Sequence, residues 1–215
     1  MNSTYAARVG GIQWRMVMAT ALAWLALACI GASPAQAAGP AKPAPAAQAR
    51  TVLVMGDSLS AGFGIAASQS WVALTGARMA KTNPGWRVVN ASISGETSAG
   101  GASRIDAELK RLHPQIVVIA LGANDGLRGL PLAQTKANLD RMIQASKAAK
   151  ARVLLIGMRM PPNYGRDYTT GFAANYTALA KQHDVPLVPF LLEPIMADRA
   201  NFQDDNLHPV AGAQP

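Results

Sequence analysis

The sequence has 215 residues, of which 50% are hydrophobic and 15% charged, and this composition excludes a disordered chain. Its length fits one ordinary domain. The formal net charge is +8, but the basic residues are scattered and have no aromatic residues interleaved with them, so we expect no nucleic-acid binding.

The first 37 residues have the pattern of a secretory signal peptide. Arg8 and Arg15 precede an apolar run at 16–32, and Ala35-Gln36-Ala37 forms a small-x-small cleavage site. A membrane anchor is an alternative interpretation, but the run is somewhat short for a span and no basic cluster follows it. We therefore predict cleavage after Ala37 and a periplasmic or secreted protein.

Cleavage after Ala37 leaves 18 basic and 12 acidic residues, a formal charge of +6 that favours anionic surfaces or substrates. It also removes Cys29, the only cysteine, so the mature protein has neither a disulfide nor thiol chemistry. A lipoprotein is the alternative for Cys29, although "ALAC" has Leu and Ala in the wrong order for a lipidation site. Residues 38–50 read as an Ala/Pro-rich linker and 51–215 as the domain.

From residue 51 onward, short β-rich runs alternate with segments of helical spacing. This alternation predicts an α/β fold with a parallel sheet and helices on both of its faces. The predicted elements are, in chain order, a strand at 51–56, a helix at 70–81, a strand at 86–93, a helix at 98–112, a strand at 115–122, a helix at 131–149, a strand at 152–158, a helix marked by Phe172, Tyr176, Leu179 and Ala180, and a strand at 186–190.

Parallel strands end at one edge of the sheet, where ligands bind, so the loops that follow the strands are the candidate site. Ser58 lies in "GDSLSAGFG", Gly95 in "SISGETSAGG" and Asn124 in "LGANDGLRG". Each also has a plain structural interpretation: a helix-capping serine, a loop glycine and an Asn-Asp-Gly turn. Together they supply a nucleophile, Ser58, and three oxyanion donors: the Ser58 and Gly95 N–H groups and the Asn124 side chain.

Acyl transfer also needs a base, and the chain has three histidines. His113 and His183 follow predicted helices at the opposite edge of the sheet, whereas His208 follows the last strand and can return to the loops. His208 is therefore the predicted base. Asp205, three residues before it, can reach the imidazole within one turn, whereas Asp204 points the other way.

Metal chemistry is a poor alternative, because no cluster of histidines or cysteines accompanies this carboxylate–histidine segment. The chain also lacks the G-x-S-x-G motif, so it does not follow the common α/β-hydrolase pattern.

These stretches resemble the four sequence blocks of the SGNH (GDSL) hydrolases. The matching residues are Ser58 in "GDSLS", Gly95 in "SGET", Asn124 in "GAND", and Asp205 and His208 in "DDNLHP". Longer stretches, among them "PPNYGRDY" and "HDVPLVPF", resemble the periplasmic thioesterase I/protease I/lysophospholipase L1 group, often described as arylesterases. The resemblance covers about residues 51–215.

The resemblance implies a flavodoxin-like three-layer fold and an acyl-enzyme formed on Ser58, with His208 as the base and Asp205 as its orienting group. It implies hydrolysis of acyl-CoA thioesters, lysophospholipids and aryl or short-chain esters, without a metal or cofactor. We expect a monomer that touches membrane surfaces only transiently. The residues that the resemblance places along the acyl site are Gly126, Leu127, Leu130, Met160, Pro161 and Tyr164.

Close relatives continue past "AGAQP" with an amphipathic helix, so the expected fold lacks a C-terminal helix and leaves a sheet face partly uncovered. Adding a relative's final helix should then raise the melting temperature. Two other functions fit the same sequence: a carbohydrate or peptidoglycan O-deacetylase, and a non-catalytic module that binds an acyl chain.

Overall fold

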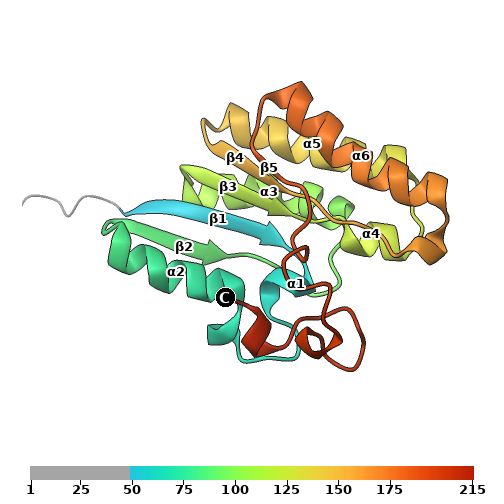
Figure 1. Cartoon of the computed structure of the whole chain (residues 1–215). Coiled ribbons are helices and arrows are strands. Elements are labelled where there is room, and N and C mark those ends of the chain that lie inside the picture. The colour runs from blue at the N-terminus through green and yellow to red at the C-terminus, as the bar shows by residue number, and fades with distance from the viewer. Residues whose placement is uncertain (1–48) are drawn as a thin grey trace, which may run out of the picture. The chain divides into compact units, whose positions relative to one another are not determined.

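A five-stranded parallel sheet forms the centre of residues 49–215, the part of the chain that the computed structural model describes (Figure 1). All neighbouring strands pair in parallel, in the order β2-β1-β3-β4-β5, which confirms the predicted sheet. The predicted signal peptide lies outside the described residues. The strands are β1 Arg50–Gly56, β2 Trp86–Asn90, β3 Ile116–Ala120, β4 Arg152–Ile156 and β5 Leu187–Val188.

Helices cover both faces of the sheet and make the three layers expected for the fold. In Figure 1, α2 lies on one side of the strands, while α3, α5 and α6 lie on the other. The helices are α1 Ser58–Ala61, α2 Trp71–Thr82, α3 Ser98–Leu112, α4 Ala123–Leu127, α5 Leu132–Ala148 and α6 Arg166–His183. Within residues 49–215, none of these helices is long and apolar enough to cross a membrane.

Strand β1 supplies side chains to both hydrophobic layers, because successive residues of a strand point to opposite faces. Leu53 and Met55 are fully buried in the larger core, which α3, α5 and α6 also line. Val52 and Val54 belong to the smaller core under α2. Both faces of β1 are therefore covered, and this explains why its sequence is a nearly continuous apolar run.

The chain after β5 returns along the carboxyl edge of the sheet and ends beside α2 (Figure 1). There the side-chain oxygen of Gln214 accepts a hydrogen bond from the backbone N–H of Trp71 at 3.0 Å. Within the described residues, no α-helix follows β5, and the last element is a 3₁₀ helix at Ala211–Ala213. This segment returns the region around residue 208 to the end of β1.

Two short helices, α1 and α4, stand where the sequence predicted loops. The plain interpretation of an Asn-Asp-Gly turn does not hold, because Asp125 and Gly126 lie inside α4 and are buried. The predicted strand at 86–93 ends as a regular strand at Asn90, although the N–H groups of Ala91 and Ile93 still donate to carbonyls of β1.

Two glycines inside helices allow a matched test of the packing. A Cβ at Gly101 of α3 would lie 2.3 Å from Leu121 Cδ1, whereas a Cβ at Gly76 of α2 would meet Val88 at an ordinary 3.5 Å. Both Gly→Ala changes gain similar helix propensity, so overpacking alone separates them. We expect Gly101→Ala to be about 1–3 kcal/mol less stable than Gly76→Ala in urea unfolding. Equal stabilities would contradict the close α3–sheet contact.

Candidate functional site

Ser58 lies two residues after the end of β1, at the first position of helix α1. Asp57 is the residue that caps this helix, since its Oδ1 accepts the N–H of Leu59 at 3.1 Å. Ser58 is therefore not the capping serine of the plain interpretation. Gly62 ends the helix with φ +78°, so the whole segment is one tight turn that presents the Ser58 side chain at the sheet edge.

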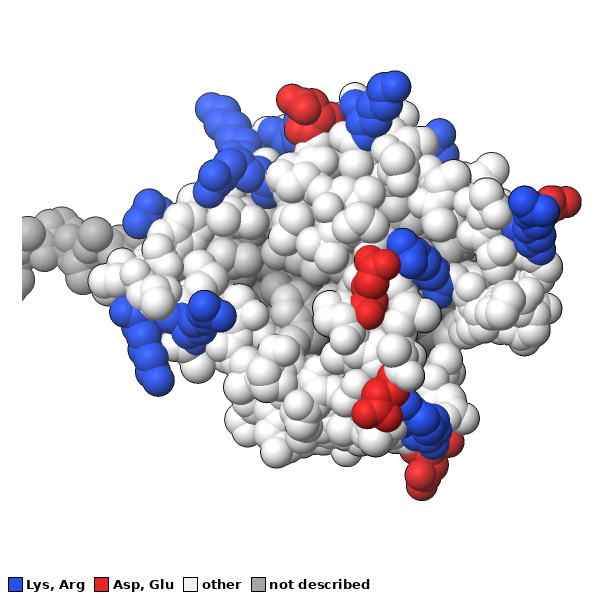
Figure 2. All heavy atoms as spheres, in the orientation of Figure 1, with Lys and Arg blue, Asp and Glu red and all other residues white. Residues whose placement is uncertain are grey.

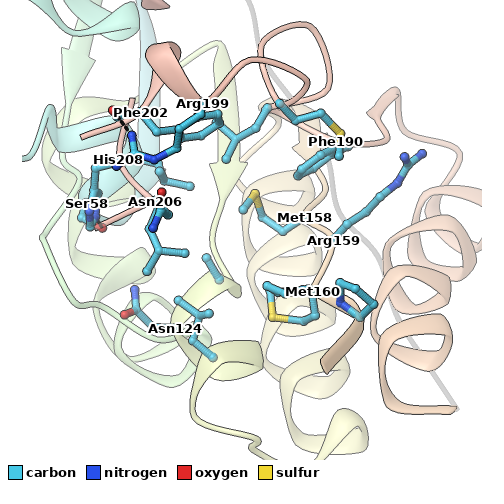
Figure 3. Close-up of a pocket in the computed structure, with 18 of the residues that line it drawn as sticks. Ser58, Asn124, Met158, Arg159, Met160, Phe190, Arg199, Phe202, Asn206 and His208 are labelled. Carbon is cyan, nitrogen blue, oxygen red and sulfur yellow. Dashed lines mark hydrogen bonds between the residues drawn. The ribbon is translucent and has the colours of Figure 1, made fainter. Parts of the chain in front are cut away.

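Ser58, His208 and Asp205 form one hydrogen-bonded chain, of which Figure 3 shows Ser58 and His208. Ser58 Oγ lies 2.8 Å from His208 Nε2, and His208 Nδ1 lies 2.6 Å from Asp205 Oδ2. A carboxylate can only accept, so Nδ1–H donates to Asp205 and Nε2 is left to accept the Ser58 hydroxyl. This is the arrangement in which a serine can lose its proton to a base.

Asp205 uses both of its carboxylate oxygens. While Oδ2 faces the imidazole, Oδ1 accepts the backbone N–H groups of Leu207 at 2.9 Å and His208 at 3.0 Å. The His208 backbone hydrogen bond is the largest of the contacts that lower the pKa of Asp205 to about 2. Asp205 therefore stays charged at any pH where the protein would work, and it fixes the orientation of His208.

The other two histidines lie away from Ser58, as the sequence predicted. His113 caps the C-terminus of α3 with φ 44°, and His183 is the last residue of α6, where it contacts Asp140 of α5. Both helix ends lie at the edge of the sheet opposite Ser58. Asp204 is exposed, and it makes no hydrogen bond or ion pair with another described residue.

The three predicted oxyanion donors follow three different strands, β1, β2 and β3, at the sheet edge where Ser58 lies. The backbone N–H groups of Ser58 and Gly95 have no acceptor within residues 49–215, and Gly95 has φ +79°, which favours glycine. The Asn124 side chain donates to the carbonyl of Glu96 at 3.0 Å, which ties the second loop to the third. These are the donors predicted for an oxyanion.

Asp125 is a part of the site that sequence reasoning missed. Its side chain is 1% exposed and accepts the Ser98 N–H at 2.7 Å, the Ser98 hydroxyl, and the Thr135 hydroxyl at 3.2 Å. Asn138 also donates to Ser98 Oγ at 3.0 Å. This buried network fastens α4, which carries Asn124, to α3 and α5. The only sequence signal for it was an acidic residue beside a candidate site residue.

An apolar cavity of about 690 Å³ opens beside Ser58. Figure 3 shows Met158, Met160 and Phe190 on its far wall, across from Ser58 and His208. The side chains come from the loops after β1, β3, β4 and β5, so one sheet edge builds the whole cavity. Besides Ser58, Asn124 and His208, the main lining residues are Leu59, Leu127, Met158, Met160, Pro161, Phe190, Leu192, Met196, Arg199, Phe202 and Leu207.

The six residues expected along an acyl site divide into two groups. Leu127, Met160 and Pro161 line the cavity. The other three, Gly126, Leu130 and Tyr164, do not line it. A Cβ at Gly126 would come within 2.3 Å of Met160 Sδ, and the Tyr164 hydroxyl donates to the carbonyl of Leu127 at 2.8 Å. Sequence reasoning missed Met158, Phe190, Leu192 and Met196, although Met158 and Phe190 directly follow β4 and β5.

No group of three or more histidine, cysteine or acidic side chains that could hold a metal ion occurs in the described part of the chain. The cavity instead offers hydrogen-bond donors and apolar walls, which suit the carbonyl and the chain of an acyl group.

Asp57 is the second ionisable carboxyl at this site and has the opposite environment to Asp205. It is 2% exposed, and burial raises its pKa to about 6 from an ordinary 3.8. In the unfolded chain the carboxyl loses its proton near pH 4, so above pH 6 folding buries a charge. That burial costs up to about 3 kcal/mol, and the cost fades as the pH falls from 6 to 4.

Asp57→Asn should therefore stabilise the protein at pH 8 by about 1–3 kcal/mol, because asparagine keeps the helix cap without the charge. The gain should disappear by pH 4, where the wild-type carboxyl is neutral in both states. Urea unfolding at several pH values measures it. Asp106→Asn, which removes an exposed carboxylate, is the control and should change stability by less than about 0.5 kcal/mol. A gain independent of pH would contradict the buried-charge explanation.

Comparison with known proteins gives consistent results for the whole domain. Residues 54–213 match the GDSL-like Lipase/Acylhydrolase family. The chain is 50% identical to the esterase TesA of Pseudomonas aeruginosa over 169 residues, 79% of this chain and 84% of that protein. It is 48% identical to thioesterase 1/protease 1/lysophospholipase L1 of Escherichia coli K12 over 171 residues, 79% of this chain and 80% of that protein.

A solved structure shows the same fold. The psychrotrophic esterase EstA from Pseudoalteromonas sp., in a structure inhibited by monoethylphosphonate, is 38% identical and superposes with a TM-score of 0.74 over 77% of this chain and 91% of that chain.

Proposed function

The chain belongs to the GDSL-like lipase/acylhydrolase (SGNH hydrolase) family and is a serine hydrolase of esters and thioesters, and we propose that Ser58, His208 and Asp205 perform its chemistry. The observation that carries this assignment is the hydrogen-bonded Ser58–His208–Asp205 chain at the mouth of an apolar cavity. The relatives named esterase and thioesterase agree with it.

In the proposed acylation step, His208 Nε2 takes the proton of Ser58 while Ser58 Oγ attacks the substrate carbonyl. The negative oxygen that forms is stabilised by the N–H groups of Ser58 and Gly95 and by the Asn124 side chain. His208 then gives its proton to the departing alcohol or thiol. A water molecule, activated by the same histidine, releases the acid from Ser58 and completes the cycle.

Asp205 acts in this scheme without exchanging a proton. Because its pKa is held at about 2, it stays a carboxylate while His208 becomes an imidazolium. It stabilises that positive charge and keeps Nε2 directed at Ser58.

We infer that the acyl chain of the substrate lies against Met158, Met160 and Phe190. Unbranched methionine side chains adapt to flexible chains, and a cavity of about 690 Å³ is far larger than an acetyl group needs. A carbohydrate O-deacetylase would need a mainly polar wall to bind the sugar, whereas Met158, Met160 and Phe190 make much of this wall apolar beside Arg159. A non-catalytic acyl-binding module would have no use for the Ser58–His208–Asp205 chain.

Export is proposed from the sequence of residues 1–37, which lie outside the described residues. We infer a monomer that acts on small acyl esters and thioesters and meets membrane surfaces only transiently. We also propose no nucleic-acid partner, because the basic residues are scattered along the sequence without interleaved aromatic residues; Figure 2 shows both positive and negative side chains on this face.

The roles of the residues can be tested with p-nitrophenyl butyrate. We expect Ser58→Ala and His208→Ala to lower kcat/KM by at least about 1,000-fold, because each removes a partner of the proton transfer. Asp205→Ala should cost less, because this residue orients and stabilises. Asp204→Ala is the matched control and should stay within about twofold. A Ser58→Ala variant as active as the wild type would exclude Ser58 as the nucleophile.

The substrate class can be tested on one preparation of the wild-type protein with palmitoyl-CoA, lysophosphatidylcholine, phenyl acetate and acetyl-xylan. We expect kcat/KM to be at least about tenfold lower for acetyl-xylan than for the other three, because Met158, Met160 and Phe190 favour an apolar acyl chain over a sugar. Preferential release of acetate from xylan would favour the deacetylase instead.

A further inference from the structure

Phe63 is an exposed aromatic residue beside the catalytic base. Its ring centroid lies 4.5 Å from that of the His208 imidazole, with the two planes tilted by 39°. The residue is still 50% exposed, although a phenylalanine gains by burial. It does not line the apolar cavity. One part of the ring therefore packs on the base while another faces solvent, outside the space assigned to the acyl chain.

The backbone holds Phe63 in this position from both sides. Its N–H donates to the carbonyl of Ser58 at 3.1 Å, and its own carbonyl accepts the side-chain amide of Gln203 at 2.7 Å. The same amide donates to Pro209 O at 3.1 Å, and the backbone N–H of Gln203 donates to His208 O at 2.8 Å. Phe63 is thus fastened to the loops of both the nucleophile and the base.

Gly64 makes this arrangement possible. It has φ +75°, and a Cβ at this position would lie 2.0 Å from Oε1 of Gln203. The glycine therefore leaves room for the amide that locks Phe63 against the His208 loop. The position of the Phe63 ring is therefore fixed by the surrounding backbone and by the Gln203 amide.

The chemistry of the reaction determines what this ring would meet. The leaving oxygen or sulfur must receive its proton from His208 Nε2, so the leaving group passes beside the imidazole. The acyl part of the substrate fills the cavity, and the leaving group must then extend outside it. Phe63 is the aromatic side chain that stands against the imidazole there.

We propose that Phe63 forms a leaving-group subsite that favours planar aromatic alcohols, that is, phenols, over aliphatic alcohols esterified to the same acid. An offset or edge contact between the phenol and the Phe63 ring would supply the preference. Such contacts correspond to about a 3- to 10-fold difference in rate. This inference rests on the proposed function, because it assumes that His208 protonates the leaving group.

The test compares phenyl butyrate with cyclohexyl butyrate, which share an acyl group and differ in the flatness of the leaving group. The value of kcat/KM reports acylation, the step in which the leaving group is present. We expect Phe63→Leu to lower the ratio of the phenyl to the cyclohexyl kcat/KM about 3- to 10-fold, and Phe63→Tyr to keep it near the wild-type value. The ratio is measured within each preparation, so the fraction of folded protein cancels.

Two controls locate the effect. The ratio of phenyl octanoate to phenyl butyrate should not change in Phe63→Leu, because the acyl cavity is intact. Ile93→Ala, which removes another half-exposed apolar side chain after β2, should leave the phenyl-to-cyclohexyl ratio unchanged.

If Phe63→Leu lowers kcat/KM equally for both butyrates, Phe63 only supports His208. If it changes neither value, Phe63 is inert. Either result contradicts the proposed leaving-group subsite. The proposed function is tested separately: if Ser58→Ala still hydrolyses both butyrates, the assignment of Ser58 as the nucleophile is wrong.

Discussion

The hydrogen bond between Ser58 and His208 joins residues 150 positions apart in the chain, and it depends on the parallel direction of every strand. Parallel strands deliver all of their following loops to one edge. Ser58 arrives after β1, Gly95 after β2, Asn124 after β3 and His208 after β5. A single reversed strand would carry one of these residues to the opposite edge, where His113 and His183 lie.

The carboxyl edge of the sheet contains buried polar side chains that a purely hydrophobic core would not contain. Asp57 is buried as a carboxyl with a raised pKa, and Asp125 is buried among hydroxyl and N–H donors. The hydroxyls of Ser60 and Ser92 are buried without a hydrogen-bond partner in the described residues, and both face Gly56, where a Cβ would collide with them. The charge on Asp57 and the unpaired hydroxyls of Ser60 and Ser92 reduce stability locally, and the two hydrophobic layers around β1 offset that loss.

Much of this fold could be predicted from apolar periodicity alone, because the inner strands β1, β3 and β4 are largely buried and the long helices bury one face. The helix at 98–112 was placed to the residue. Helix α4 was missed because Asn-Asp-Gly has the local preference of a turn, and only donors from α3 and α5 make a helix with a buried Asp125 more favourable.

The polar residues of the candidate site left a signal in the sequence, whereas the residues of the cavity wall did not. A serine, a histidine and an aspartate that all follow strands of one parallel sheet fit few functions together, so these residue types and their positions predicted the site. Met158, Phe190 and Met196 are apolar residues in or near strand ends, and such residues look alike in sequence whether they face the core or an open cavity. Only the path of the chain after β5 decides which of them face Ser58.

Two aspartates near the same histidine show how environment, and not residue type, sets the electrostatics. Asp205 meets two backbone N–H groups and an imidazole, and its pKa falls to about 2. Asp57 meets mainly the protein interior, and its pKa rises to about 6, with His208 opposing that rise. Asp205 therefore provides a charge that does not change with pH, whereas the charge on Asp57 is lost in mild acid. An imidazolium formed at His208 above pH 6 is stabilised by both carboxylates, and below that pH by Asp205 alone.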